Sequence, residues 1–244
     1  MLDLAAWLYH IDLAIAMILI MGTSENNRSR AYIPALSYAW LTPYFDPLLK
    51  WVMQDEVFKV RLLEVAHLES ASSVLDLGCG TGTLTILAKR RCPSIQITGL
   101  DIDPAVLNIA RKKAIQAGAQ VRWEIGMADE LTFDKATFDR VLSSLMFHHL
   151  DRAAKVRALE ETFRVLKPGR ELFILDFGVP HTAWMKLIAI ALRRLEEVED
   201  NFQGLIPEMM CNVGFEGVTE LEHFSTTLGP LSIFRGQKPG LSPV

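Results

Sequence analysis

Val-Leu-Asp-Leu-Gly-Cys-Gly-Thr-Gly, residues 74–82, is the stretch that decides the fold. An apolar run ending in an acid, Asp76, has the composition of a short buried strand, and three glycines at alternate positions follow it. Glycine leaves the backbone bare, which lets a ligand approach the turn between a strand and a helix. Gly78, Gly80 and Gly82 therefore predict a cofactor-binding turn.

The spacing of these glycines narrows the class of ligand. The dinucleotide fingerprint places two residues between its second and third glycines, whereas only Thr81 intervenes here. The turn also lacks the Gly-Lys-Ser/Thr ending that meets the phosphates of nucleoside triphosphates. Asp76 would repel phosphates and attract an ammonium group, so we expect a cationic or zwitterionic nucleoside. An ordinary tight strand-to-helix junction is the alternative that the turn alone leaves open.

Two later segments carry further strands. Residues 95–101 predict a strand ending in Asp101, at the distance from the glycines where such α/β folds place a carboxylate on ribose hydroxyls. The alternative is that Asp101 caps the next helix, but Asp103 directly precedes Pro104 and suits that cap better. Residues 121–125 predict a third strand.

These motifs together resemble those of the class I S-adenosylmethionine-dependent methyltransferases, whose first motif is an acid followed by Gly-x-Gly-x-Gly. The resemblance covers residues 31–236 and includes the turn Lys167-Pro168-Gly169 before a strand at 171–177. Relatives often carry a second glycine where this chain has Arg170, so we expect a less tight turn. Through residues 143–150 and the Lys-Pro-Gly turn, the chain is similar to the ubiquinone and menaquinone C-methyltransferases and the phospholipid methyltransferases.

The resemblance implies a Rossmann-like α/β fold, with a seven-stranded, mostly parallel sheet, helices on both faces and a C-terminal antiparallel hairpin. Residues 201–213 predict a helix ending at Gly214, and residues 215–221 and 228–235 predict the hairpin. It also implies S-adenosyl-L-methionine as cofactor and S-adenosyl-L-homocysteine as product. The cofactor-binding residues carried over are Asp76, Gly78, Cys79, Gly80, Gly82, Asp101, Ile102, Met127, Ala128 and Ser144.

Met127 departs from the family pattern. Many relatives carry an aspartate directly before the alanine, where it accepts a hydrogen bond from the adenine amino group. Here adenine would rest on the thioether of Met127 and meet backbone groups near Ala128. Asp129 is either a substitute acceptor or a solvated loop acid.

Residues 138–150 predict the fourth strand and a following loop that contains adjacent histidines, His148 and His149. Ligands of open α/β sheets sit beyond the carboxyl ends of the strands, so the segment from Ser144 should face the transferred methyl group. An imidazole there is a candidate general base. The alternative is that one ring bonds a backbone group while the other starts the next helix. Because adjacent residues rarely converge on one ion, and no cysteine or carboxylate stands at ligand spacing, we expect no metal.

Length and composition agree with one catalytic domain, since 244 residues with 50% hydrophobic content can bury a sizeable core. A net charge of −4 and a pI near 5.9 provide no general attraction to nucleic acid. The three cysteines are few and widely spaced, which suits a reducing compartment. We therefore expect a cytoplasmic protein with a small-molecule acceptor and no nucleic-acid partner.

Residues 1–30 read as an apolar N-terminal helix and linker. The helix lacks the positive charge of a secretory signal, and Asp3 and Asp12 disfavour a membrane span. We expect it to pack on the domain, on a partner or on a membrane surface, which makes a peripheral membrane or oligomer contact an expectation. The alternative is a start codon placed too far upstream.

Residues 31–244 read as the methyltransferase domain, with a lid at 31–70 and a cap insertion at 180–212. Tyr44 and Phe45 are lid candidates, because relatives of the quinone group fold an N-terminal segment over the cofactor, although aromatic side chains also commonly pack against sheets. Trp184 is a candidate for lining an apolar acceptor pocket, or for the buried face of an amphipathic helix.

The predicted function is methyl transfer to a small, apolar or lipid-like acceptor by in-line displacement. The alternative is a non-catalytic binding or scaffold protein that keeps the cofactor fold, because fold does not fix function.

Overall fold

The computed structural model describes residues 55–182, 185–186, 197–226 and 229–240. The predicted N-terminal helix and linker, Tyr44, Phe45 and Trp184 lie outside these residues. The elements in chain order are α3 (Asp55–Val65), η2 (Leu68–Ser70), β1 (Ser73–Leu77), α4 (Thr83–Arg91), β2 (Gln96–Asp101), α5 (Pro104–Gln116), β3 (Arg122–Ile125), β4 (Phe138–Ser144), η3 (Phe147–His149), α6 (Arg152–Val165), β5 (Leu166–Phe177), α8 (Glu199–Phe202), α9 (Ile206–Val213), β6 (Glu216–Thr226) and β7 (Gly229–Gln237).

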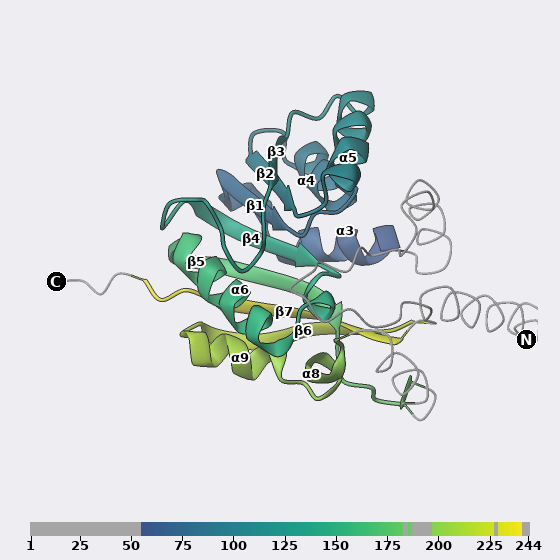
Figure 1. The fold of residues 1–244 in the computed structure, drawn as a ribbon, viewed down its shortest axis with the longest axis vertical. Helices are drawn as coiled ribbons and strands as arrows, with labels where there is room; N and C mark the ends of the chain where they lie inside the picture. Colours follow the sequence, from purple (N-terminus) through teal and green to yellow (C-terminus); the bar gives the residue numbers. More distant parts are fainter. Residues whose placement is uncertain (1–54, 183–184, 187–196, 227–228, 241–244) are drawn as a thin grey trace, which may run out of the picture.

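The strands form one seven-stranded sheet in the order β3-β2-β1-β4-β5-β7-β6 (Figure 1). Neighbours among β1 to β5 pair in parallel, whereas β7 runs antiparallel to both β5 and β6. The Rossmann-like class and the C-terminal hairpin predicted from the sequence are therefore confirmed. Strand order reverses between β1 and β4, and ligands of open α/β sheets bind in the crevice at such a point.

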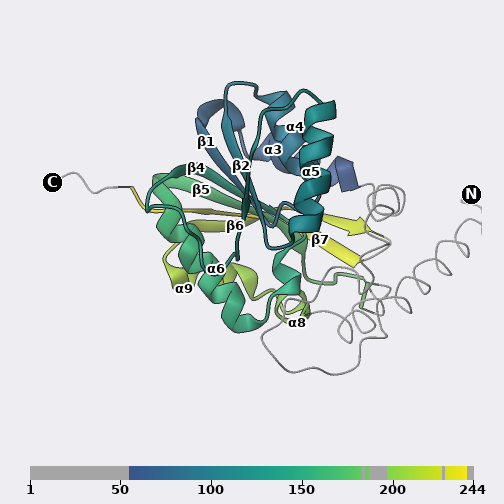
Figure 2. The ribbon, with the colours of Figure 1, turned by 45° about the horizontal axis from the view of Figure 1, so that its top comes forward.

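Helices cover both faces of the sheet, and each face has its own apolar core (Figures 1 and 2). Val74 of β1 packs with α3 and α4 on one face, whereas Leu75 and Leu77 pack with α6 and α9 on the other. Strands buried on both faces read as continuous apolar runs, which is why β1 was recognisable in the sequence. α3, at the end of the segment predicted as a lid, contributes the buried Leu62 and Leu63 to the first core.

Two element boundaries differ from the sequence prediction. The helix predicted over 201–213 is two short helices, α8 and α9, because Gly204 between them adopts a left-handed backbone (φ 73°). The predicted turn at Lys167-Pro168-Gly169 is an irregularity within β5, where Leu166 pairs with Phe138 but Glu171 already pairs with Arg140. The end of the helix at Gly214 is as predicted.

Among the residues described, no helix has the length and apolar character needed to cross a bilayer.

Asp139 ties the start of β4 to the start of β1. Its Oδ2 accepts hydrogen bonds from the backbone N–H groups of Ser72 and Ser73 at 3.0 Å, and Lys167 Nζ lies 3.1 Å from Oδ1. Burial by itself would raise the pKa of Asp139, but these hydrogen bonds outweigh burial and lower the pKa to about 2.

We expect this carboxylate to make part of the protein's stability sensitive to acid. A depressed folded-state pKa means that the stabilisation is present above the ordinary value of 3.8 and is lost as pH falls toward 2. Asp139→Asn should therefore lower the free energy of unfolding at pH 6. Between pH 6 and pH 2.5 the variant should then lose less of its free energy of unfolding than the natural protein does, as measured by urea unfolding. An equal loss of stability in the variant and the natural protein would contradict this role.

Candidate active site

The candidate site lies where the loops after β1 and β4 meet. These strands are paired, with Leu77 opposite Ser143, so both loops leave the same edge of the sheet. They also touch, because a Cβ placed on Gly78 would lie only 2.2 Å from Cγ of Met146. The predicted cofactor turn and the predicted histidine loop are therefore neighbours in space.

The glycine-rich turn is folded back onto the end of β2. The N–H groups of Gly78 and Cys79 both donate to Leu100 O at 2.9 Å, and Gly80 N donates to Asp101 Oδ2 at 2.8 Å. Gly80 has a left-handed backbone (φ 53°), and a Cβ placed on it would meet no atom within 4 Å among the described residues. Bare backbone at this residue therefore faces open space at the mouth of the crevice.

The cap at Asp103 is confirmed, whereas the ribose contact of Asp101 stays a prediction. Asp103 caps α5, because its Oδ1 accepts from Ala105 N at 2.7 Å and Pro104 follows it. Asp101, at the end of β2, instead accepts hydrogen bonds from Gly80 N and from Asp103 N. Burial raises the pKa of Asp101, and these backbone hydrogen bonds oppose that shift. The next residue, Ile102, is half-buried.

Asp76 lies deeper than the sequence indicated. Its side chain is 1% exposed, and Thr85 Oγ1 of α4 donates to its Oδ2 at 2.5 Å. Burial raises the pKa of Asp76 to about 6, although the hydrogen bond from Thr85 opposes this rise. The predicted contact of Asp76 with an ammonium group stays a prediction.

The segment after β3 holds the residues predicted to meet adenine. Met127 is 49% exposed, which leaves its thioether available to a planar ligand, and Ala128 is half-buried. Asp129 is half-buried, and its Oδ2 lies 2.7 Å from Nη2 of Arg157, while Oδ1 keeps its capacity to accept a hydrogen bond. The role of Asp129 as a substitute acceptor stays a prediction, and the sequence did not indicate that α6 brings an arginine to this loop.

Two further predicted residues lie at the crevice. Ser144 Oγ is buried and has no hydrogen-bond partner among the described residues, which leaves a polar atom to be satisfied by a ligand. Cys79 is buried, and burial raises the pKa of its thiol well above the ordinary value. A thiol of this kind is unreactive, so Cys79 contributes a small side chain to the turn and no nucleophile.

The adjacent histidines differ in environment. His149 is exposed, whereas His148 is 7% exposed and its Nδ1 lies 2.8 Å from Oδ1 of Asp176 at the end of β5. The two rings lie 4.0 Å apart, and the ring of Phe177 meets His148 edge-on at 4.9 Å. Burial and the contact with Asp176 hold the ring of His148 in one orientation.

Asp176 organises the histidine loop, and sequence reasoning missed it. Its Oδ2 accepts from the N–H groups of Met146 and Phe147 at 3.1 and 2.8 Å, and Asn201 Nδ2 of α8 lies 3.2 Å from Oδ1. Burial by itself would raise the pKa of Asp176, but the charge of His148 and the hydrogen bonds lower it. An ionised Asp176 only accepts hydrogen bonds, so Nδ1 of His148 carries a proton, and Nε2 is then the nitrogen able to accept one in the neutral ring.

α8 is fixed by charges on α6. Asp200 forms ion pairs with Arg152 and with Lys155, whose Nζ lies 3.6 Å from Asp200 Oδ2. Lys155 is fully buried, and burial lowers its pKa despite the attraction of Asp200. This pairing places Asn201 beside Asp176.

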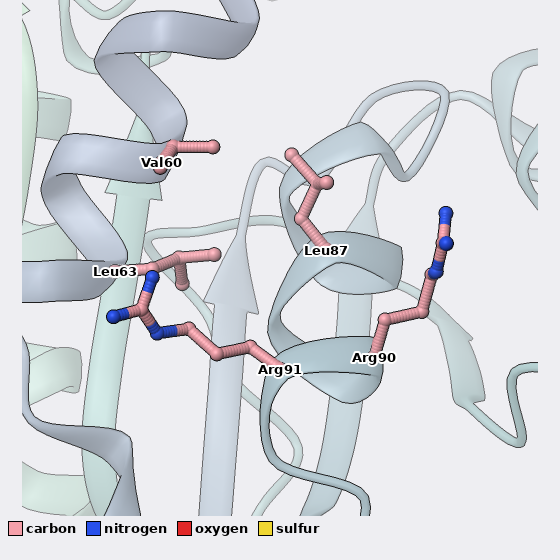
Figure 3. A pocket seen from close by; sticks show the side chains of 5 residues that line it. All are labelled: Val60, Leu63, Leu87, Arg90 and Arg91. Carbon is pink, nitrogen blue, oxygen red and sulfur yellow. The ribbon is translucent and has the colours of Figure 1, made fainter.

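A separate hollow of about 360 Å³ lies between α3 and α4 (Figure 3). It is lined by Val60, Leu63, Leu87, Arg90 and Arg91. Its α4 residues come from the end of that helix remote from the glycine turn, and its lining includes no acid, histidine or nucleophile. We therefore assign it no part in the candidate site.

Comparison with known families agrees with the fold. A family model described as a methyltransferase domain matches residues 74–169, which run from β1 through the histidine loop to the irregularity in β5. Residues 74–169 are a class I methyltransferase domain.

The methyltransferase domain is similar to enzymes that act on quinones. Over 145 residues the chain is 33% identical to the demethylmenaquinone methyltransferase of Thermus thermophilus, covering 59% of this chain and 65% of that protein. Over 187 residues it is 27% identical to the mitochondrial 2-methoxy-6-polyprenyl-1,4-benzoquinol methylase of Caenorhabditis elegans, covering 68% and 65%. The chain thus spans less than two thirds of the length of these relatives.

A solved structure shows the same fold. An N-methyltransferase from Haemonchus contortus, determined with phosphomonomethylethanolamine and S-adenosylhomocysteine, superimposes with a TM-score of 0.62 at 18% identity. The match covers 74% of this chain and 52% of that one. At this identity the likeness concerns the fold of the methyltransferase domain.

The residues present fit S-adenosylmethionine. The open space at Gly80 admits a ligand to the backbone, Ser144 Oγ offers an unsatisfied polar atom, and Asp101 closes the crevice with a carboxylate. The ligand has an ammonium group and ribose hydroxyls but no phosphate, which suits a site with the half-buried acid Asp101 and the deeper acid Asp76.

Proposed function

We propose that the protein is an S-adenosylmethionine-dependent methyltransferase whose acceptor is a small apolar quinol. The observation that carries the proposal is the pairing of two features at one crevice. One is a bare backbone turn closed by Asp101, and the other is a histidine held by a buried carboxylate. A non-catalytic scaffold would need the first feature for ligand binding but has no use for the second.

The residues of the crevice have different roles in the reaction. S-adenosylmethionine supplies an electrophilic methyl group when it is bound. The turn at Gly80, with Asp101 and Ser144, holds it at the carboxyl ends of β1, β2 and β4. His148 Nε2 accepts the proton of an acceptor hydroxyl, and Asp176 stabilises the resulting imidazolium while keeping the ring in place. Holding the acceptor near the methyl group supplies several kcal/mol toward the barrier.

The acceptor class follows from the surroundings of His148 and from the relatives. Phe177 lies against the imidazole, and Phe177 in turn packs on Phe202 at 5.8 Å, so the base has an aromatic side chain beside it and a second behind that one. A flat apolar ring that carries an acidic hydroxyl suits such surroundings. Removal of the hydroxyl proton makes a quinol ring carbon nucleophilic, which is the reactivity that a C-methyltransferase needs. Once that carbon carries the methyl group, it releases its own proton to solvent and the aromatic ring is restored. The quinol and quinone substrates in the names of the relatives have this chemistry.

The remaining predictions from the sequence are part of the same proposal. Within the predicted lid 31–70, the part before α3 covers the cofactor through Tyr44 and Phe45, and within the predicted cap 180–212, the part before α8 covers the acceptor through Trp184. The apolar N-terminal residues 1–30 make a peripheral membrane or oligomer contact, which would bring a cytoplasmic enzyme to a membrane-dissolved quinol.

A product assay tests the function directly. The full chain is incubated with S-adenosylmethionine and a demethylated naphthoquinone, either reduced to the quinol or oxidised, and S-adenosylhomocysteine is quantified with mass detection of the methylated ring. We expect product with the quinol and none with the quinone, which has no hydroxyl proton to lose. Equal product from both redox states would contradict the role of the base. Cofactor binding without product from quinols, phenols or lipids would favour the scaffold.

Asp76 predicts how cofactor affinity depends on pH. A carboxyl with a pKa of about 6 becomes neutral as pH falls below that value and then no longer attracts an ammonium group. Affinity for S-adenosylmethionine should therefore fall by up to about tenfold per pH unit below 6. Titrations at pH 5, 6 and 7.5 measure this dependence. Asp76→Asn should bind S-adenosylmethionine more weakly than the natural protein at pH 7.5, and its affinity should change less with pH. If the affinity of the variant fell equally steeply with pH, the titrating group would be one other than Asp76.

A further inference from the structure

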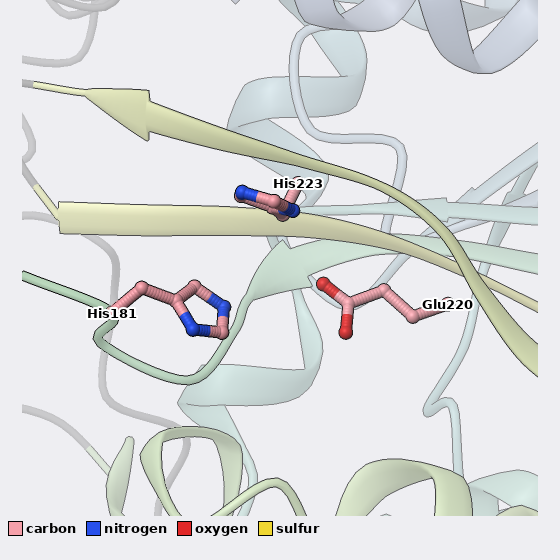
Figure 4. Close-up of side chains that lie close together, drawn as sticks. All are labelled: His181, Glu220 and His223. Atoms are coloured by element: carbon pink, nitrogen blue, oxygen red, sulfur yellow. The ribbon is translucent and has the colours of Figure 1, made fainter.

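Three side chains able to bind a metal ion gather near the outer edge of the sheet. His181 follows β5, whereas Glu220 and His223 belong to the edge strand β6 (Figure 4). One ligand atom from each residue lies within 4.8 Å of the other two, and all three residues are exposed. The imidazole rings of His181 and His223 lie 4.9 Å apart.

A β-bulge brings the two residues of β6 to the same face. Side chains three positions apart on a regular strand point to opposite faces. Here Glu220 pairs with Phe234 and Glu222 with Ile233, so Leu221 is an extra residue in β6. Bulges re-aim side chains in this way. His223 then pairs with Ser232, two residues from Phe234 on β7, and so shares a face with Glu220.

The carboxylate of Glu220 is itself held by a neighbour. Ser232 Oγ on β7 donates to Glu220 Oε1 at 2.7 Å. Hydrogen bonds of this kind orient metal-ligating carboxylates and hold them ready for an ion.

We propose that His181, Glu220 and His223 bind a divalent transition-metal ion of the zinc class. Two imidazoles and one carboxylate are a common zinc ligand set, in which water fills the fourth position. Metal–ligand distances of about 2.1 Å would bring the ligand atoms to roughly 3.4 Å from one another in a tetrahedral site. Because all three side chains are exposed, small rotations close the remaining gap. One negative charge from Glu220 partly neutralises the ion.

The position of the site indicates what a bound ion would do. A bound ion would link the segment after β5 to the edge strand β6 through the side chains of its three ligands. Asp176 pairs with Ser232 on β7, and Ser232 pairs with His223 on β6, so these three side chains form one row on one face. The ion would therefore lie about two strand spacings, roughly 10 Å, from the carboxylate that holds His148. Sequence reasoning missed this site because it considered only partners of the adjacent pair, His148 and His149.

Zinc titration of the full chain tests the proposal. The protein is first treated with a chelator to remove bound metal, and the chelator is then removed. We expect saturable binding of zinc chloride, followed by calorimetry, and a rise in the thermal unfolding midpoint. His223→Asn should weaken binding by about tenfold or more. The matched control is His67→Asn, which changes an exposed histidine outside the three-residue cluster and should leave zinc affinity unchanged.

Two results would overturn the proposal. One is the absence of saturable zinc binding to the natural protein, and the other is unchanged affinity in His223→Asn. Glu220→Gln provides an independent second variant, and it should also weaken binding. The metal-free variants are expected to keep the unfolding midpoint of the natural protein, since both substituted side chains are exposed. Ser232→Ala should reduce zinc affinity less than either, because it removes only the hydrogen bond to Glu220.

Discussion

His148→Gln is expected to reduce methyl transfer by about 10²- to 10⁴-fold, the usual contribution of a general base. Glutamine can still donate a hydrogen bond to Asp176, so the loop after β4 should keep its conformation, but an amide does not take up a proton. The measurement is single-turnover formation of S-adenosylhomocysteine with a quinol acceptor. Cofactor affinity of the variant should stay within a few-fold of that of the natural protein.

The neighbouring histidine provides the matched control. His149 is exposed and its ring lies tilted against that of His148, whereas His148 is buried with its Nδ1 2.8 Å from Asp176 Oδ1. His149→Gln should therefore retain most of the turnover. Asp176→Asn should lower turnover too, and should shift its pH profile, because the carboxylate stabilises the charged imidazole. The reverse ranking, with His149→Gln the more damaging change, would sink the assignment of His148 as the base.

Gly80→Ala is expected to weaken S-adenosylmethionine binding by roughly 10- to 10²-fold. The new methyl group would project into the open space at the turn, where we expect the cofactor to bind. An extra methyl group in a closely packed contact with the cofactor typically costs about 1–3 kcal/mol. The substitution also strains the left-handed backbone at this residue, which lowers stability by about 1–2 kcal/mol whether or not a ligand binds. Calorimetric titration measures the first effect and thermal unfolding the second.

Gly118 separates these two effects. It has a similar left-handed backbone (φ 63°), and a Cβ placed on it would also meet no atom within 4 Å among the described residues, but it lies after α5 and away from the crevice. Gly118→Ala should lose a similar amount of stability and keep its cofactor affinity. If both variants bind S-adenosylmethionine as the natural protein does, the turn at Gly80 does not face the cofactor.

Local patterns predicted those parts of the molecule that depend on neighbours in the sequence. The strand before Gly78, the cap at Asp103 and the stop at Gly214 each follow from residues within a few positions, and the structure confirms them. Gly204 and Pro207 also carried a local indication of a helix break, which the single-helix prediction over 201–213 overlooked.

Contacts between remote segments were not predictable in this way. Asp176 lies 28 positions from His148, and only the pairing of β4 with β5 brings the two together. Nothing near Asp129 in the sequence indicates that Arg157 will neutralise it. The bulge that turns Glu220 toward His223 depends on pairing with β7, so the sequence gives no sign of it.

Binding of the cofactor is the central claim, and calorimetric titration with S-adenosylmethionine and S-adenosylhomocysteine tests it most directly. We expect micromolar binding of both by the full chain. Asp101→Asn should weaken it markedly, whereas Asp134→Asn, at an exposed loop acid, should not. Failure of the well-folded natural protein to bind either ligand would contradict the account, and so would unchanged affinity in Asp101→Asn.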